Sequence, residues 1–117
     1  MTIDFFVLGL SFILLHEMDA VRCHEWRIFP ATSFLNDRAG MIVFTLLHIP
    51  LFYILLLPQY FNNPTFRVGF SIFLIIHVFL HLLFLLHKKN EFKDWVSWLL
   101  IKGAGLSGAL FLIKNWS

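Results

Sequence analysis

The side chains best suited to chemistry in this sequence are imidazoles and carboxylates that fall inside apolar runs. His77 and His81 are spaced i, i+4, so on a helix both imidazoles project from one face, a spacing that lets one helix supply two ligands to one metal ion. At 100° per residue, His16 and Asp19 also share a helical face, and His48 stands near the middle of another apolar run. Imidazole and carboxylate form the ligand set of zinc or non-haem iron. We therefore expect a metal site drawn from these five residues.

Further charged residues have expected roles beside this metal. Glu17 adjoins the first ligand and is the carboxylate we assign to catalysis, where it would handle protons. Arg22 and Glu25 are spaced i, i+3, which favours a simple ion pair at the membrane surface. Lys102 falls within the last apolar run, where it either reaches the interface or compensates a buried carboxylate.

Four apolar runs must position these residues, and their composition requires lipid as the solvent. Of 117 residues, 59% are hydrophobic and 14% are charged, against roughly 25% charged in an ordinary soluble domain. A bilayer core of about 30 Å needs roughly 20 mostly apolar residues per helical span, so the chain has room for four spans and no soluble domain. We predict an all-α protein, a polytopic membrane four-helix bundle. It forms a single transmembrane domain over 1–117, with helices at about 3–28, 39–57, 66–88 and 94–114.

The first apolar run, 5–15, is informative because it is too short to cross a bilayer. The helix must continue through the polar residues that follow, and ionisable groups at that depth are costly unless they face protein, water or a metal. From a rise of 1.5 Å per residue, His16 and His81 lie about 9 Å below the same membrane face and His48 about 13 Å below it. Three helices therefore bring histidines to similar depths.

Lysine and arginine counts predict the orientation. One side is expected to carry Arg22, Arg27, Arg38, Lys88, Lys89 and Lys93, and the other side Arg67 and Lys114. By the positive-inside rule, both termini are expected outside the cytoplasm, with the histidines in the cytoplasmic half. The basic residues are scattered over loops and form no stripe, so no nucleic-acid partner is expected.

Small residues in the last apolar run predict close helix packing. Gly105, Gly108 and Ala109 belong to overlapping small-xxx-small pairs, which let membrane helices approach each other closely. This pattern leaves open whether the protein forms an oligomer.

The leading functional hypothesis is a membrane-embedded zinc-dependent hydrolase. A catalytic zinc needs three protein ligands and an open position for water, whose pKa it lowers to about 7. Inside a bilayer, such a site would act on a lipid or another apolar substrate. One alternative is a haem b protein for electron transfer or sensing, with His48 and either His77 or His81 as axial ligands. Another is a non-catalytic binding or partner protein whose polar residues only lock the bundle. A di-iron oxygenase is less favoured, because the sequence has a single His-x-x-x-His box.

The run His16-Glu17-Met18-Asp19-Ala20, followed by Glu25-Trp26-Arg27, resembles the signature of a family of small, uncharacterised bacterial four-helix membrane proteins. In that signature a His-Glu-x-Asp segment ends the first helix and a Glu-Trp pair follows. The run is more distantly similar to the membrane family named for its His-x-x-Glu-Glu motif, from which it departs at Asp19 and Ala20. The first resemblance implies that His16, Glu17, Asp19 and Glu25 form the signature, and neither implies an established activity. A soluble zincin is excluded, because Ala20 stands where the His-Glu-x-x-His helix needs its second ligand.

Overall fold

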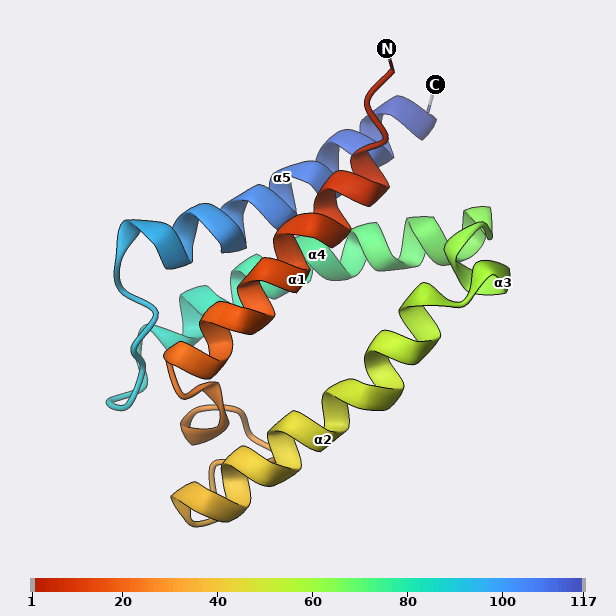
Figure 1. Ribbon diagram of the computed structural model, residues 1–117. Coiled ribbons are helices and arrows are strands. Elements are labelled where there is room, and N and C mark those ends of the chain that lie inside the picture. The colour runs from red at the N-terminus through yellow and green to blue at the C-terminus, as the bar shows by residue number, and fades with distance from the viewer. Residues whose placement is uncertain (1, 117) are drawn as a thin grey trace.

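The computed structural model describes residues 2–116, and its elements within that range are all helical. The helices are α1 (Phe5–Arg22), α2 (Asp37–Leu56), the short α3 (Pro58–Phe61), α4 (Pro64–Phe84) and α5 (Trp95–Trp116), and a 3-10 turn, η1 (Glu25–Arg27), follows α1. Figure 1 shows their arrangement. The all-α class predicted from the sequence is confirmed.

Side-chain caps fix where three of the long helices begin. Asp4 accepts hydrogen bonds from two backbone N–H groups in the first turn of α1. Asn36 and Asn63 each accept from the N–H three residues further on, at the starts of α2 and α4. These contacts satisfy donors that a helix start otherwise leaves free. The polar residues between the apolar runs therefore set the helix boundaries.

Two helices end earlier than the sequence predicts. α1 ends at Arg22 rather than near residue 28, because the backbone of His24 adopts the left-handed conformation, with φ of 52°. Such a residue commonly ends a helix. α4 ends at Phe84 rather than near residue 88, because the next hydrogen bonds, from the N–H groups of Leu86 and His87, span three residues and tighten the chain into a turn.

The core of the fold is formed by α1, α4 and α5. Figure 1 shows α1 lying against α4 and α5, with the start of α1 beside the end of α5. The helices α4 and α5 approach closely: a Cβ at Gly108 would come within 2.5 Å of the backbone oxygen of Ser71, and a Cβ at Gly105 would collide with Val78. Both glycines lie at this helix contact, whereas Ala109 is half-buried.

Two apolar clusters fill the core, and polar residues lie between them along the helices. On α1, Ile13 belongs to one cluster and Ala20 to the other, with the buried His16 between them. On α4, Leu74 belongs to the first cluster and is followed by the buried His77. The histidines are therefore enclosed by apolar packing at neighbouring levels.

The helix α2 stands apart from this core. Figure 1 shows it splayed away from α1 and α4. Phe44, two turns into the helix, and Leu55, at its end, are buried and join the two apolar clusters. Between them, Leu47 and Leu51 are 49% and 46% exposed. The middle of α2 is therefore separated from the three-helix core.

Within residues 2–116, three helices are long and apolar enough to cross a membrane: α2, α4 and the part of α5 over Trp95–Asn115. α1 is not among them, and its 18 residues include the charged side chains of Glu17, Asp19 and Arg22. Three helices thus support the predicted membrane protein, and hydropathy does not identify α1 as a fourth.

Candidate metal centre

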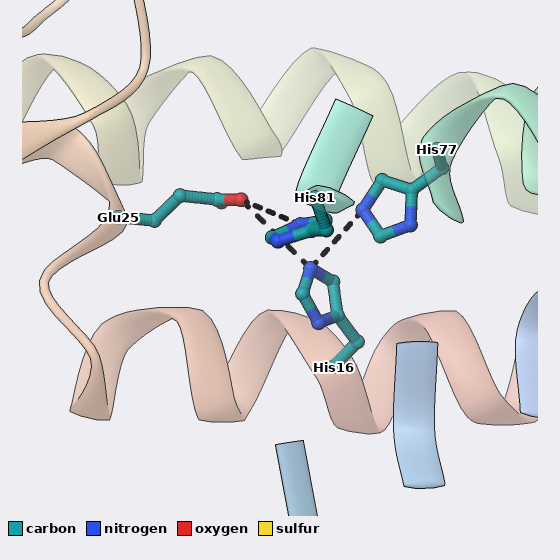
Figure 2. A group of neighbouring side chains, drawn as sticks. All are labelled: His16, Glu25, His77 and His81. Atoms are coloured by element: carbon teal, nitrogen blue, oxygen red, sulfur yellow. Dashed lines mark hydrogen bonds and ion pairs between the residues drawn. The ribbon is translucent and has the colours of Figure 1, made fainter. Parts of the chain in front are cut away.

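Four buried side chains from three segments converge in the core. They are His16 from α1, Glu25 from η1, and His77 and His81 from α4, and we call them the His–Glu cluster. Their ligand atoms all lie within 4.8 Å of one another. Figure 2 shows the four side chains directed toward one another. None is more than 8% exposed, so the cluster is shielded from solvent.

Distances within the cluster fit the ligands of one small metal ion. Nε2 of His16 lies 3.1 Å from Nε2 of His77 and 3.8 Å from Oε1 of Glu25. Nε2 of His81 lies 3.2 Å from the same Oε1. Ligands bound at 2.0–2.2 Å to a tetrahedral zinc are separated by roughly 3.3–3.6 Å. The three separations in the cluster bracket this range, and the ligand types suit zinc or iron.

The chain reversal after α1 brings Glu25 into the cluster. Left-handed backbone is rare outside glycine, so the turn at His24 needs support from its surroundings. The adjacent Trp26 supplies some of it: its indole N–H donates to Asp37 at 2.8 Å, and the hydroxyl of Thr32 donates to its carbonyl at 2.8 Å. The turn is therefore held by contacts with residues that follow it in the chain.

Glu25 does not form the surface ion pair with Arg22 that their spacing predicts. The prediction assumed a continuous helix, whereas the helical spacing stops at Arg22 and Glu25 faces His16 and His81. Burial by itself raises the pKa of Glu25, but its contacts with His16 and His81 outweigh burial and lower the pKa to about 2. The Glu25 carboxylate is therefore charged and suited to bind a cation.

Aromatic packing closes the cluster on the side of the loop after α4. Phe92 is fully buried, and its ring centroid lies 5.4 Å from that of His16 and 4.6 Å from that of His81. The imidazole of His77 has its centroid 4.5 Å from each of the other two. Electrostatic interactions are stronger in such surroundings because water is excluded.

Several nitrogen atoms of the cluster have no hydrogen-bond partner within the part of the chain that the structure describes. They are Nδ1 of His16, His77 and His81, and Nε2 of His81. An unpaired buried polar atom costs about 1–3 kcal/mol, and such atoms are rare in folded proteins. The unpaired nitrogens fit a binding site better than a completed structural network.

Glu17 and His48 form a second pair, outside the cluster but in the same cavity. Nε2 of His48 lies 2.5 Å from Oε2 of Glu17, and its Nδ1 lies 2.6 Å from the carbonyl oxygen of Phe44. A cavity of about 310 Å³ between α1, α2 and α4 is lined by this pair and by three members of the cluster, Glu25, His77 and His81. The predicted ligand His48 and the predicted catalytic Glu17 therefore adjoin the cluster across a cavity.

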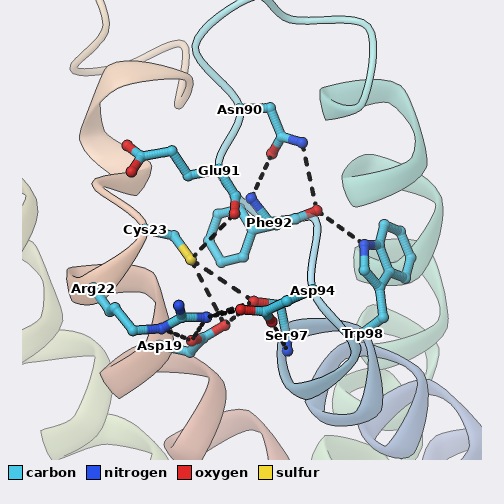
Figure 3. A network of polar contacts seen from close by, with 9 residues as sticks. All are labelled: Asp19, Arg22, Cys23, Asn90, Glu91, Phe92, Asp94, Ser97 and Trp98. Carbon is cyan, nitrogen blue, oxygen red and sulfur yellow. Dashed lines mark hydrogen bonds and ion pairs between the residues drawn. The ribbon is translucent and has the colours of Figure 1, made fainter.

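Asp19 belongs to a separate network that occupies both of its oxygens. Nε of Arg22 donates to Oδ1 at 2.7 Å, and the hydroxyl of Ser97 donates to Oδ2 at 2.6 Å. Arg22 also donates to Asp94 at 3.0 Å. We call these four residues the Asp19 network, and Figure 3 shows it where the end of α1 meets the start of α5. Asp19 is directed toward α5, whereas the cluster joins α1 to α4.

Lys102 lies at the surface and does not compensate Asp19. Its side chain is exposed, with Nζ 5.8 Å from the centroid of the Trp98 ring. The oxygens of Asp19 are already occupied by Arg22 and Ser97. Of the two roles predicted for Lys102, reaching the interface fits this position.

Three of the five predicted ligands, His16, His77 and His81, are brought together by the structure, and Asp19 and His48 lie elsewhere. The member that helical spacing missed as a ligand is Glu25. Spacing could not find it, because a chain reversal separates it from α1. The signal that did single it out is the Glu-Trp pair of the signature that the sequence resembles.

Fold and site together define an all-helical protein that has, within residues 2–116, three helices apolar enough to cross a membrane and a buried cluster able to hold a metal ion. A family model matches residues 2–117, and the chain belongs to that family, the family of unknown function DUF6713. No curated protein and no solved structure matches the chain. Membership of a family without an assigned function is consistent with the predicted resemblance to uncharacterised proteins.

Proposed function

We propose that the chain is a four-span membrane protein in which α1 crosses the bilayer beside α2, α4 and α5. α1 has 18 residues, against 21 in α4 and 22 in α5, and its two ends pair with the ends of these helices. Asp4 pairs with Arg67 of α4 at 3.1 Å, and Arg22 pairs with Asp94, just before α5, at 3.0 Å. The buried polar side chains of α1 are directed into the His–Glu cluster and the Asp19 network, which reduces their cost in a bilayer. The lysine and arginine counts then favour non-cytoplasmic termini and a cluster in the cytoplasmic half.

The His–Glu cluster is proposed to bind zinc. The observation that carries this proposal is the convergence of three imidazoles and one carboxylate, all buried, with unpaired nitrogens among them. His16, His77 and His81 supply the three protein ligands that a catalytic zinc requires. The remaining position would stay open for water, and the carboxylate of Glu25 beside these ligands would balance part of the charge of the ion.

A site of this kind supports hydrolysis of an apolar substrate. Bound zinc would polarise a carbonyl group and make water acidic enough to react near neutral pH. Glu17 is the residue suited to take the proton from that water, because it lines the same cavity without belonging to the cluster. His48 contacts the Glu17 carboxylate and holds its orientation. The proposed function is therefore a membrane-embedded, zinc-dependent hydrolase.

Elemental analysis and the absorption spectrum of the detergent-purified chain test the metal site. We expect about one zinc ion per chain. The double variant His77→Ala with His81→Ala should lose it, whereas His87→Ala, at an exposed histidine just after the same helix, should keep it. Circular dichroism verifies that each variant is folded. A Soret band would instead indicate haem b, and iron without that band would indicate a non-haem iron site. A metal-free protein would favour the non-catalytic alternative.

Hydrolysis of a chromogenic apolar ester tests the role of Glu17. Glu17→Gln should keep its zinc while its rate falls by about 10²–10⁴-fold, the usual contribution of a general base. Glu91→Gln is the matched control, because Glu91 is an exposed carboxylate outside this cavity. Equal rates in the two variants would remove Glu17 from the mechanism.

A further inference from the structure

We infer that the substrate of this site is a neutral acyl ester, in which a fatty acid is joined to an uncharged alcohol, and that it enters from the bilayer between α1 and α2. The inference rests on the proposed hydrolytic function and adds the substrate class and its route.

The route consists of two adjoining hollows. The cavity beside the His–Glu cluster has a volume of about 310 Å³, and a neighbouring groove between α1 and α2 has about 330 Å³. Glu17, Phe44 and His48 line both. Each is near the lower end of the size range of small-molecule sites, roughly 300–1,000 Å³. A ligand in the groove would therefore reach the cluster by passing the Glu17–His48 pair.

The groove opens on a surface that faces lipid in a four-span arrangement. Its lining includes Met18 of α1 and Ile49 of α2, which are 70% and 64% exposed. Ile49 lies in the middle of a helix whose length and hydropathy suit a membrane span. The separation of α2 from the core thus creates an opening at the depth of the acyl chains rather than at the membrane surface.

The lining of both hollows suits hydrocarbon but does not by itself select a substrate. The walls are largely Leu, Ile, Met and Phe side chains, including Leu14 and Phe52 in the groove and Leu51 and Phe73 in the cavity. Lipid tails are as apolar as these side chains, so moving an acyl chain from the bilayer into the groove gains little hydrophobic free energy. Selection must therefore take place at the polar end of the substrate.

Charge at the polar end favours an uncharged substrate. Among the described residues, neither hollow is lined by lysine or arginine, and the carboxylates of Glu17 and Glu25 together balance the two charges of a zinc ion. A phosphate brought into this cavity would add an unpaired negative charge to a dry site, which is costly. Lys88, Lys89 and Lys93 instead line a separate pocket at the surface.

The reaction is a balanced hydrolysis with no redox step. A water oxygen forms a bond to the acyl carbon, and the bond from that carbon to the alcohol oxygen breaks. Glu17 takes one proton from the water and passes it to the departing alcohol. The products are a fatty acid and a neutral alcohol. Ionisation of the fatty acid then makes it unfavourable in the same cavity, which promotes its release.

Hydrolysis rates for two esters with the same acyl chain test the charge argument. The zinc-loaded full chain is given 1-palmitoylglycerol, which is neutral, and palmitoyl lysophosphatidylglycerol, which is anionic. We expect kcat/KM to be higher for the neutral ester by about ten-fold or more. Equal rates, or preference for the anionic ester, would overturn the inference while leaving the hydrolase proposal intact.

A photoreactive alkyl glycerol ether, neutral and not hydrolysable, tests the route independently of catalysis. Its label should map to the α1 and α2 segments around Met18 and Ile49. Leu47→Trp, which fills the cavity, should reduce both this labelling and ester hydrolysis by about ten-fold at unchanged zinc content. Leu106→Trp, at an exposed position on α5 outside both hollows, should change neither. Labelling spread evenly over the lipid-facing helices would overturn the route even if zinc is bound, whereas a protein without zinc would refute the proposed function itself.

Discussion

Two polar groups include residues of α1 that lie about one turn apart, and their hydrogen bonding differs. In the Asp19 network, Arg22 and Ser97 occupy both carboxylate oxygens of Asp19. In the His–Glu cluster, four imidazole nitrogens have no hydrogen-bond partner within the described residues, although Nε2 of His81 forms an ion pair with Glu25. Both groups contain residue types that bind metals, so composition alone does not separate them. A buried polar group whose hydrogen bonds are complete is typical of a structural role, whereas unpaired buried donors and acceptors are typical of a binding site.

The two groups also join different parts of the fold. The Asp19 network connects the end of α1 to the start of α5, whereas the cluster connects α1 and η1 to α4. Substitutions in one group should therefore leave the function of the other largely intact. Four predictions test this separation, beginning with the largest effect.

Metal removal should distinguish the groups most strongly. A ligand present at about 1,000 times its Kd stabilises the folded state by about 4.1 kcal/mol, so chelation should lower the Tm of the wild-type chain markedly. The double variant His77→Ala with His81→Ala should not respond to the chelator, whereas Asp19→Ala should respond like wild type. Thermal melts in detergent, with and without chelator, measure this. The same chelator response in both variants would contradict the assignment.

Breaking the Asp19 network should lower stability without loss of metal. Asp19→Ala leaves the buried hydroxyl of Ser97 without its acceptor, and we expect a loss of about 1–3 kcal/mol in the free energy of unfolding. Zinc content should stay at the wild-type level. Unfolding titrations and elemental analysis on one preparation measure both quantities. Loss of zinc in Asp19→Ala would mean that the two groups are coupled.

Separating α4 from α5 should weaken the cluster by a smaller amount. Gly108→Ala places a Cβ within 2.5 Å of the backbone oxygen of Ser71, so α4 must shift and carry His77 with it. We expect zinc affinity to fall by about ten-fold or less, measured by competition with a coloured chelator. Gly69→Ala, on α4, is the control, since nothing lies within 4 Å of the added carbon. An equal effect from both substitutions would place its cause outside the α4–α5 contact.

Lowering the pH should weaken the Asp19 network slightly, because its exposed member, Asp94, becomes protonated. This is the smallest of the four expected effects. The backbone N–H of Ser97 lowers the pKa of Asp94 below its ordinary 3.8, and Arg22 adds to this. A carboxyl with a lowered folded-state pKa stabilises the fold above its unfolded pKa, and this contribution is lost as pH falls through the lower folded value. Stability should therefore decline slightly below about pH 4. Asp94→Asn should remove that part of the pH dependence in melts between pH 3 and 7, and an unchanged profile would count against it.

The predicted helices were recovered to within a few residues except where the chain turns back on itself. Apolar runs and polar caps act over short stretches, so the starts of α2 and α4 follow from the residues around Asn36 and Asn63. The end of α1 does not follow from the residues around it. The left-handed turn at His24 is supported by Asp37 and Thr32, which contact Trp26, two residues after His24. Glu25 becomes a member of the cluster through contacts of this kind, between residues 6 and 11 positions apart, which the spacing along one helix does not predict.

By itself, the sequence determined the all-α class, the apolar helices and the shared face of His77 and His81, since helical geometry fixes side-chain direction over a few residues. Tertiary structure decided which polar groups meet. Glu25 contacts His81 in the cluster, and Asp19 accepts a hydrogen bond from Ser97 of α5. His48 contacts Glu17, and this pair lines the cavity beside the cluster. The physical reason is that the rotation and separation of neighbouring helices depend on packing, as at Gly105 and Gly108, and spacing along one helix contains no information about its partner.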